Sequence, residues 1–197
     1  MLGHMSVVAQ KVTVSYQDYV AAEAAAATKS EWINGVVYAM AGGTLLHARL
    51  AMAVGRAIGD QLRGKPCAVF SSDLRIRSLF SEIASYPDLT VVCGPPQMHT
   101  QDIQACTNPT VIVEVIVEVL GPSTETFDRG DKAAHYRRMP SVLAYVLVST
   151  SEQRIEVFTR ATDGAFVFTE AGPGQSVSIA PIECSLVVDD IYFDPLA

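Results

Sequence analysis

The chain has 197 residues, of which 49% are hydrophobic and 18% charged. This is the composition of an ordinary globular protein, and it excludes a disordered chain. The formal charge of −7, from 14 basic and 21 acidic residues, argues against a protein that holds nucleic acid by charge alone, because phosphate contacts need clustered Lys and Arg. No apolar run approaches the roughly 20 residues that span a bilayer, so we expect no membrane segment.

One domain over residues 1–197 is expected at this length. Within it we expect a disordered tail at 1–11, a core at 44–150 and a β extension at 151–197. No secretory signal pattern opens the sequence. The cysteines form no CxxC pair and a chain of this size needs no staples, so reduced thiols and a cytoplasmic protein are expected. The cysteines in question are Cys67, Cys93, Cys106 and Cys184.

The N-terminal part predicts a helix, a hairpin and a second helix. Residues 12–28 have good helix propensity. Asn34-Gly35 is the strongest short hairpin signal in the sequence, so short strands are expected on both sides of it. Residues 44–64 carry apolar side chains every four positions, which predicts an amphipathic helix that begins after Thr44.

The middle of the chain reads as three strands, a helix and a fourth strand. The strands are expected at 67–77, 86–93, 110–120 and 142–149, with a loop at 94–109 and a helix that ends near Arg138. Together with the helix at 44–64, this order predicts an α/β fold with a helix-strand-strand-strand-helix-strand core. Residues 154–179 predict an antiparallel extension with a turn at Asp163-Gly164.

The strand at 110–120 carries two carboxylates where a buried strand has apolar side chains. Its odd positions are all valine, so one face is buried, and Glu114 and Glu118 share the other face. An ionised carboxylate in such a place costs several kcal/mol unless it is paired or bound to a cation. Four residues of strand span about 13 Å, so the two acids cannot hold one ion together.

Glu118 is the better metal candidate, because a Gly121-Pro122 turn follows it and leads to a helix that carries Lys132. Glu114 is then a structural acid or a copy left by a small duplication of Val-Ile-Val-Glu. A slip of the strand by four residues exchanges the two roles, and both alternatives stay open. Asp88 follows a proline at the start of the neighbouring strand, where a turn residue is the simpler interpretation.

The combination of Asp88, Glu118 and Lys132 predicts more than any of them alone. Two carboxylates from adjacent strands suit Mg²⁺ or Mn²⁺, which keeps waters and accepts phosphate oxygens. A lysine beside the ion can orient or deprotonate an attacking water, or stabilise the charge on the phosphate. These residues are the equipment for metal-assisted hydrolysis of a phosphodiester.

The Pro-Asp step and the order of helices and strands resemble the PD-(D/E)XK nuclease superfamily. From about Tyr16 to Phe158 the chain is more closely similar to the Uma-two family of restriction-endonuclease-like proteins. The segments that carry this resemblance are EWINGVVYAMAGG, the helix with His47, SSDLRIR, YPDLTVVCG and VEVLGPSTETFDRGDKAAHYRRMPSVLAYVLV.

The resemblance implies a restriction-endonuclease-like core with metal ligands at Asp88 and Glu118. Leu120 stands two residues after Glu118, where the superfamily has its lysine, and the family resemblance moves that role to Lys132. It also implies accessory acids, and the accessory residues that we expect are Glu31, Asp73, Glu114 and His47. For His47 a capping or partly buried histidine is the simpler interpretation.

These observations lead to the hypothesis of a Mg²⁺- or Mn²⁺-dependent endonuclease that hydrolyses DNA. The alternative is a non-catalytic binding or dimerisation module on the same scaffold, in which internal Lys or Arg neutralise the acids; the negative net charge and the missing lysine after Glu118 favour it. A hydrolase of another phosphoester is a third hypothesis. A homodimer is expected from the fold class.

Overall fold

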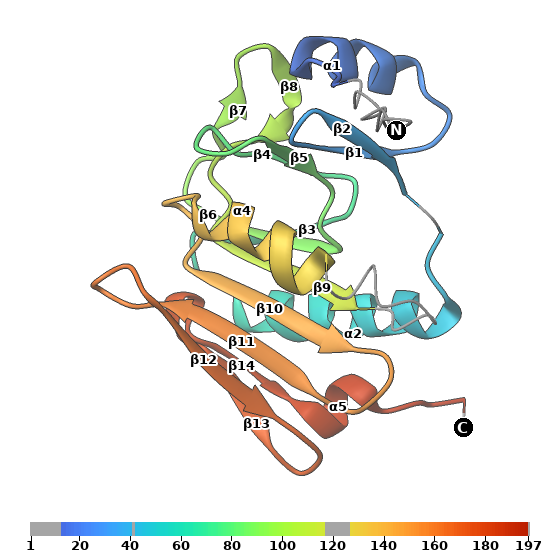
Figure 1. Ribbon diagram of the computed structural model, residues 1–197. Coiled ribbons are helices and arrows are strands. Elements are labelled where there is room, and N and C mark those ends of the chain that lie inside the picture. The colour runs from blue at the N-terminus through green and yellow to red at the C-terminus, as the bar shows by residue number, and fades with distance from the viewer. Residues whose placement is uncertain (1–12, 41, 117–126, 197) are drawn as a thin grey trace, which may run out of the picture.

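A computed structural model describes residues 13–40, 42–116 and 127–196. Within these ranges the chain forms two six-stranded sheets and a two-stranded hairpin sheet, with helices packed around them (Figure 1). The N-terminal elements are α1 (Tyr16–Ala25), β1 (Ser30–Ile33), β2 (Val36–Ala39), α2 (Leu45–Gln61), β3 (Cys67–Ser71), β4 (Arg75–Arg77), β5 (Ile83–Ser85), β6 (Leu89–Cys93), β7 (Met98–His99) and β8 (Asp102–Cys106). The C-terminal elements are β9 (Val111–Ile116), η1 (Phe127–Lys132), α4 (Ala133–Arg137), β10 (Ala144–Ser149), β11 (Ile155–Arg160), β12 (Phe166–Ala171), β13 (Ser176–Ile179), η2 (Ala180–Ile182), β14 (Cys184–Val187) and α5 (Val188–Tyr192).

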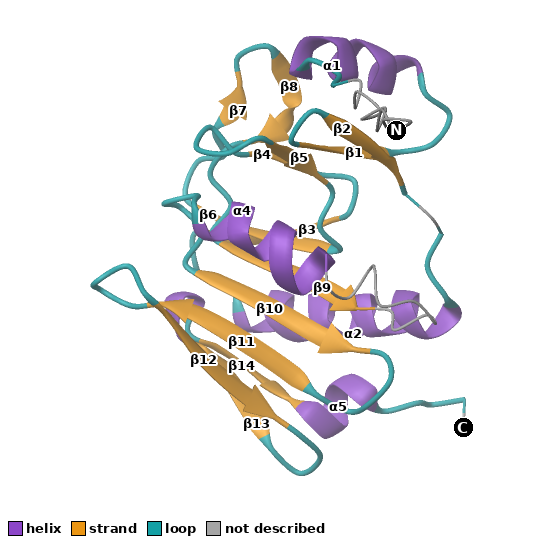
Figure 2. Cartoon of the chain, viewed as in Figure 1, coloured by secondary structure: helices purple, strands orange, loops and turns teal. Residues whose placement is uncertain are grey.

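The predicted core order is confirmed. α2, β3, β6, β9, α4 and β10 follow one another as helix, strand, strand, strand, helix and strand, although two pairs of short strands interrupt the run. Their sheet has the strand order β12-β11-β10-β9-β6-β3, and only the β9–β10 pair is parallel. The predicted antiparallel extension is also confirmed, since β11 and β12 continue this sheet (Figure 2).

The two helices of the core cover opposite faces of this sheet. Val111 and Val113 point to the α2 side, where they pack with Leu50 and Val54. Ile112 points to the other side and packs under α4. Val111 and Val113 of the all-valine face are therefore buried, as predicted, because alternate side chains of a strand face opposite ways.

The second sheet was not predicted as a unit. Its strand order is β2-β1-β5-β4-β8-β7, and most of its strands have only two to four residues, too short for a clear alternation of polar and apolar positions. The predicted strand at 67–77 breaks into β3 and β4 around a turn, and the predicted loop at 94–109 contains β7 and β8. The Asn34-Gly35 hairpin is confirmed, with φ of 50° and 78°, the positive values that a tight hairpin turn requires.

The prediction of four reduced cysteines is wrong for two of them. Cys67 and Cys93 form a disulfide across β3 and β6, where they are register partners with their Cα atoms 4.0 Å apart. The pairing depends on strand register, which the spacing of 26 residues does not reveal. Cys106 and Cys184 are free and buried. No helix of the described ranges is long and apolar enough to cross a membrane.

Candidate functional site

One buried lysine joins acids that come from both large sheets. The Nζ atom of Lys132 lies 3.0 Å from Oε2 of Glu31 and 3.5 Å from Oε1 of Glu114. All three side chains are less than a tenth exposed. Because each of these charges loses several kcal/mol of hydration on burial, the group is stable only when the opposite charges meet.

Local sequence places each member of this cluster. Glu31 lies on β1, one residue before the buried Trp32. Glu114 shares its face of β9 with Ile112, the face that α4 covers. Lys132 ends the π-helical turn η1 at the start of α4, and such turns are frequent at functional sites because they change which way the following side chains point.

Tyr136 lies one helical turn after Lys132 and orients Glu114. Its hydroxyl donates to Oε1 of Glu114 at 2.9 Å and lies 3.1 Å from Oγ of Ser85. Burial raises the pKa of Tyr136 well above its ordinary value, and the charges of Glu114 and Glu31 raise it further. The phenol therefore stays protonated as a donor. The i, i+4 spacing of Tyr136 from Lys132 is the signal in the sequence that points to the shared site.

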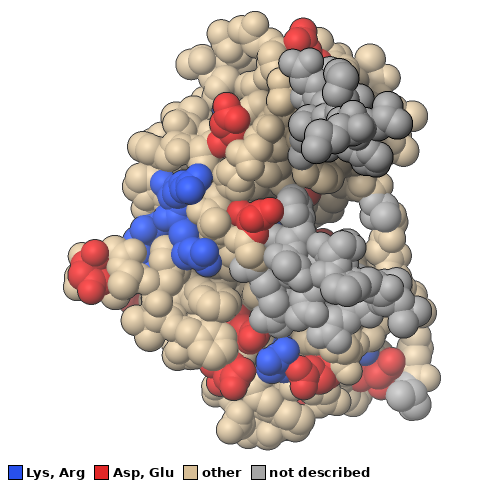
Figure 3. Space-filling model, viewed as in Figure 1, with Lys and Arg blue, Asp and Glu red and all other residues tan. Residues whose placement is uncertain are grey.

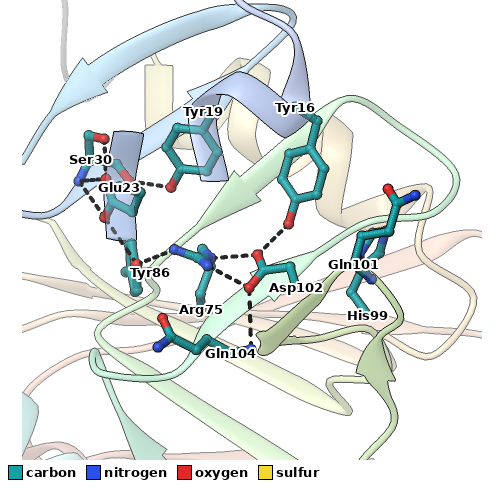
Figure 4. Close-up of polar contacts among 10 residues, drawn as sticks. All are labelled: Tyr16, Tyr19, Glu23, Ser30, Arg75, Tyr86, His99, Gln101, Asp102 and Gln104. Carbon is teal, nitrogen blue, oxygen red and sulfur yellow. Dashed lines mark hydrogen bonds and ion pairs between the residues drawn. The ribbon is translucent and has the colours of Figure 1, made fainter. Parts of the chain in front are cut away.

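Glu31 is held from its other side by Tyr86. The backbone N–H of Tyr86 donates to Oε1 of Glu31 at 3.2 Å. The phenol of the same residue accepts from Arg75 at 2.8 Å and donates to Glu23 at 3.0 Å (Figure 4). Burial raises the pKa of Tyr86 to about 12, so its hydroxyl proton is kept near neutral pH. Tyr86 thus links Glu31 to a second polar network.

That network centres on an ion pair inside the second sheet. Arg75 donates to both carboxylate oxygens of Asp102, at 2.9 Å and 2.6 Å, and the two side chains are 3% and 2% exposed. Tyr16 of α1 donates to Oδ2 of Asp102 from the other side (Figure 4). The two-pronged geometry is the strong form of an arginine–carboxylate contact, so it fixes β4 against β8 and α1 above them.

Asp88 lies immediately before β6 and contacts the start of α2. Its Oδ1 is 3.1 Å from Nε2 of His47. This hydrogen bond raises the pKa of His47, against the lowering effect of burial. Gly43 makes room for the ring, because a Cβ atom there would lie 2.5 Å from Nδ1 of His47.

The register of the sheet relates Asp88 to Glu114. Leu89 pairs with Val113 in the antiparallel β6–β9 ladder, so the next step of the same register sets Asp88 opposite Glu114. The two acids thus stand at facing positions of this register, and their side chains contact different partners, His47 of α2 for Asp88 and Lys132 for Glu114. The partner in this register is Glu114, whereas Glu118 lies outside the described residues.

The two accessory acids expected with Glu114 lie in different places. Glu31 is part of the Lys132 cluster. Asp73 lies at the surface, where its Oδ1 is 2.5 Å from Nζ of Lys29 and its side chain is 85% exposed. No three His, Cys, Asp or Glu side chains of the described ranges gather closely enough to hold a metal ion between them. Two carboxylates are fewer protein ligands than such a group, and an ion held by them would complete its shell with water and substrate oxygens, as Mg²⁺ does.

A sheet between α2 and α4, with acids at adjacent positions of neighbouring strands, defines a mixed α/β protein with a restriction-endonuclease-like core. Residues 16–188 match the Uma2 family, whose description is "Putative restriction endonuclease", and the chain belongs to this family. The match confirms the expected resemblance to the Uma-two proteins.

Two relatives and one solved structure are similar to the chain over most of its length. Two uncharacterized proteins of Synechocystis sp., slr1290 and sll1609, are 30% and 31% identical to the chain over 179 and 166 residues; the alignments cover 91% and 84% of this chain and 91% and 92% of the relatives. A crystal structure of "a putative nuclease" from Anabaena variabilis superimposes with a TM-score of 0.62 at 14% identity, over 84% of this chain and 90% of that one. At that identity the likeness concerns the fold.

Proposed function

We propose that the protein is a metal-dependent nuclease that hydrolyses phosphodiester bonds of DNA. Asp88 and Glu114 bind Mg²⁺ or Mn²⁺, and Lys132 acts beside them. The observation that carries the proposal is the contact of Lys132 with Glu114, at the position that register sets opposite Asp88. The description of the Uma2 family supports the same reaction class.

The roles follow from chemistry. The ion, when bound, polarises the phosphoryl group and makes a coordinated water more acidic. Lys132 is held between two carboxylates, and as an ammonium group it offers a positive charge to a phosphate oxygen. Tyr136 keeps one oxygen of Glu114 turned toward the lysine. Asp88 would share the ion with Glu114, and its contact with His47 would then be shared or lost.

The choice of Glu114 rather than Glu118 is also part of the proposal. In the register of β6 and β9, Glu114 is the acid opposite Asp88, and it is the one that Lys132 and Tyr136 contact. The duplicated Val-Ile-Val-Glu allows a second register shifted by four residues, in which Glu118 takes that place. Glu118 therefore stays a prediction from the sequence and serves as the matched control.

The test is cleavage of plasmid and linear DNA with Mg²⁺ or Mn²⁺ by the variants Asp88→Asn, Glu114→Gln and Glu118→Gln. Changes to groups outside the metal ligands cost about 10- to 100-fold, so loss of a ligand should exceed that. We expect Asp88→Asn and Glu114→Gln to lose activity and Glu118→Gln to keep it. The opposite result for the two glutamates would establish the shifted register, and full activity in all three would refute the site. Circular dichroism checks that each variant is folded.

One observation favours the non-catalytic alternative. Each candidate acid already has a cationic or ionisable partner inside the chain: Lys132 for Glu31 and Glu114, and His47 for Asp88. A binding module needs no more than this. Calorimetric titration with Mn²⁺ separates the two functions, since the nuclease should bind the ion with an affinity that falls in Asp88→Asn, whereas the module should bind none.

A further inference from the structure

The sheet face under α4 extends beyond the helix. Register places Tyr145 beside Phe158 and Phe158 beside Phe168, so that one row of side chains runs across β10, β11 and β12. Each ring lies close to the next one in the row. The centroids of Tyr136 and Tyr145 are 5.3 Å apart, those of Tyr145 and Phe158 are 6.4 Å apart, and those of Phe158 and Phe168 are 5.1 Å apart. The row begins at the tyrosine that orients Glu114.

This aromatic row becomes exposed as it leaves the helix. Tyr136 and Tyr145 are buried at 0% and 1%, Phe158 is half-buried, and Phe168 on the edge strand β12 is 47% exposed. Phe166 lies two residues along the same face. Phe168 therefore leaves about half of its side chain in water on an open sheet face. Exposed apolar side chains that lie together on a surface indicate a site of contact with a partner.

Arginines flank the exposed end of the row. Arg160 lies over the ring of Phe166, 4.5 Å from its centroid, and donates to the backbone oxygens of Arg137 and Met139 at the end of α4. The side chains of Arg137 and Arg138 are themselves exposed. In Figure 3 most Lys and Arg side chains of the visible face gather at this place, over the end of α4 and beside the start of β10.

The acidic side chains of β11, β12 and the turn between them lie away from these arginines, and two of them are paired. Glu156 and Glu170 occupy the other end of β11 and β12, where both approach Arg154. Asp163 stands at the tip of the β11–β12 turn. In a chain with a net charge of −7, three arginines grouped beside exposed phenylalanines form a local site for an anionic partner with flat, apolar rings.

We propose that this aromatic–arginine face, made of Phe158, Arg160, Phe166 and Phe168 with Arg137 and Arg138, binds an unpaired strand of nucleic acid. Bases stack on the phenylalanine rings while the arginines contact the phosphates, the combination that binds single strands without sequence preference. The bases of a duplex are already stacked on one another, so a duplex has fewer free base faces to stack on the phenylalanine rings. The assignment of a nucleic-acid partner rests on the proposed nuclease function, whose site begins the same row.

The test is fluorescence anisotropy with labelled oligo(dT) of about 20 nucleotides and with a duplex of equal length, in EDTA so that no cleavage occurs. Phe168→Leu keeps an apolar side chain and removes the ring, so we expect affinity for oligo(dT) to fall about tenfold and affinity for the duplex to stay unchanged. Arg137→Gln/Arg138→Gln should lower the slope of log affinity against log salt by about 1.4, because a single-strand phosphate contact contributes about 0.7.

Matched controls lie on other faces of the molecule. Val167 is 54% exposed on the opposite side of β12, so Val167→Ala should leave binding unchanged. Arg56→Gln/Arg63→Gln removes the same charge from α2 and the turn that follows it, on the other layer, and should lower the salt slope less than the Arg137 and Arg138 pair does.

Three results would overturn the proposal: unchanged oligo(dT) binding in the Phe168 and arginine variants, equal losses in the controls, or an equal loss for the duplex. Sedimentation of Phe168→Leu tests a second copy of the chain as the occupant instead; a shift from dimer to monomer without loss of oligo(dT) binding would make this face a subunit interface. The assay needs no catalysis, so loss of binding here and loss of cleavage in Asp88→Asn are separate outcomes.

Discussion

Glu31 precedes the central strand β9 in the chain and Lys132 follows it, and their side chains form a buried ion pair with Nζ and Oε2 3.0 Å apart. Replacement of Lys132 by Met leaves Glu31 and Glu114 without this cation. We expect the free energy of unfolding to fall by about 3 to 5 kcal/mol, as for other broken buried pairs. Urea titration with an unchanged m-value measures it, and Lys29→Met, which breaks the exposed pair with Asp73, should change little. Equal effects of the two variants would contradict the buried pairing.

Tyr136 gives a sharper test of the same cluster. Tyr136→Phe removes one hydroxyl and leaves a buried oxygen of Glu114 without its 2.9 Å donor, so we expect a loss of about 1 to 3 kcal/mol in stability. Ser85→Ala is the control, because it removes the other neighbour of the hydroxyl and keeps the bond to Glu114. If the proposed site is correct, Tyr136→Phe also lowers cleavage more than Ser85→Ala; the reverse order would place Tyr136 in the core alone.

The order of helices and strands in the core is predictable from the sequence because the signals for these elements are local. The i, i+4 apolar spacing of α2, the valine alternation of β9 and the Asn34-Gly35 turn each depend on neighbours in the chain. The second sheet depends on pairings that no local pattern records, such as β4 beside β8. Most of its strands are too short to show a period, so a loop was predicted where β7 and β8 lie.

The candidate site was predictable in kind but not in partners. Buried acids on a central strand predicted that a cation must be near, and Lys132 is that cation for Glu114. The contacts of Tyr86 and Tyr136 could not be predicted, because they depend on how the second sheet and α4 pack over β9. Which of Glu114 and Glu118 faces Asp88 depends on a register that the repeated Val-Ile-Val-Glu leaves open in sequence.

The pair of Arg75 and Asp102 should show strong coupling. Asp102→Leu alone leaves the guanidinium of Arg75 buried without its carboxylate, and we expect it to cost about 3 to 5 kcal/mol. Adding Arg75→Met removes the stranded charge, so the double variant should recover most of that loss. Thermal or urea unfolding of the four proteins closes the cycle. Additive losses would mean that the two groups do not interact in solution.

His135 makes stability depend on pH. Burial lowers the pKa of His135, and the charge of Arg138 lowers it further. The neutral ring accepts from Nδ2 of Asn34 at 3.2 Å, a contact that a protonated ring cannot accept. As pH falls below about 6.5, the unfolded chain binds a proton that the folded chain does not, so stability decreases until pH passes the lowered value. Denaturant midpoints between pH 8 and 5 should show this fall, and His135→Gln should weaken it relative to His99→Gln.

The disulfide between Cys67 and Cys93 can be tested directly by counting the free thiols. Under denaturing conditions without reductant, iodoacetamide should label only Cys106 and Cys184, and after reduction it should label all four cysteines. A bridge over a separation of 26 residues is expected to add about 3 kcal/mol by restricting the unfolded chain, so Cys67→Ser/Cys93→Ser should unfold at lower urea. Cys184→Ser, which leaves the bridge intact, is the control. Four labelled thiols before reduction, in protein purified without reductant, would show that β3 and β6 are joined by hydrogen bonds alone.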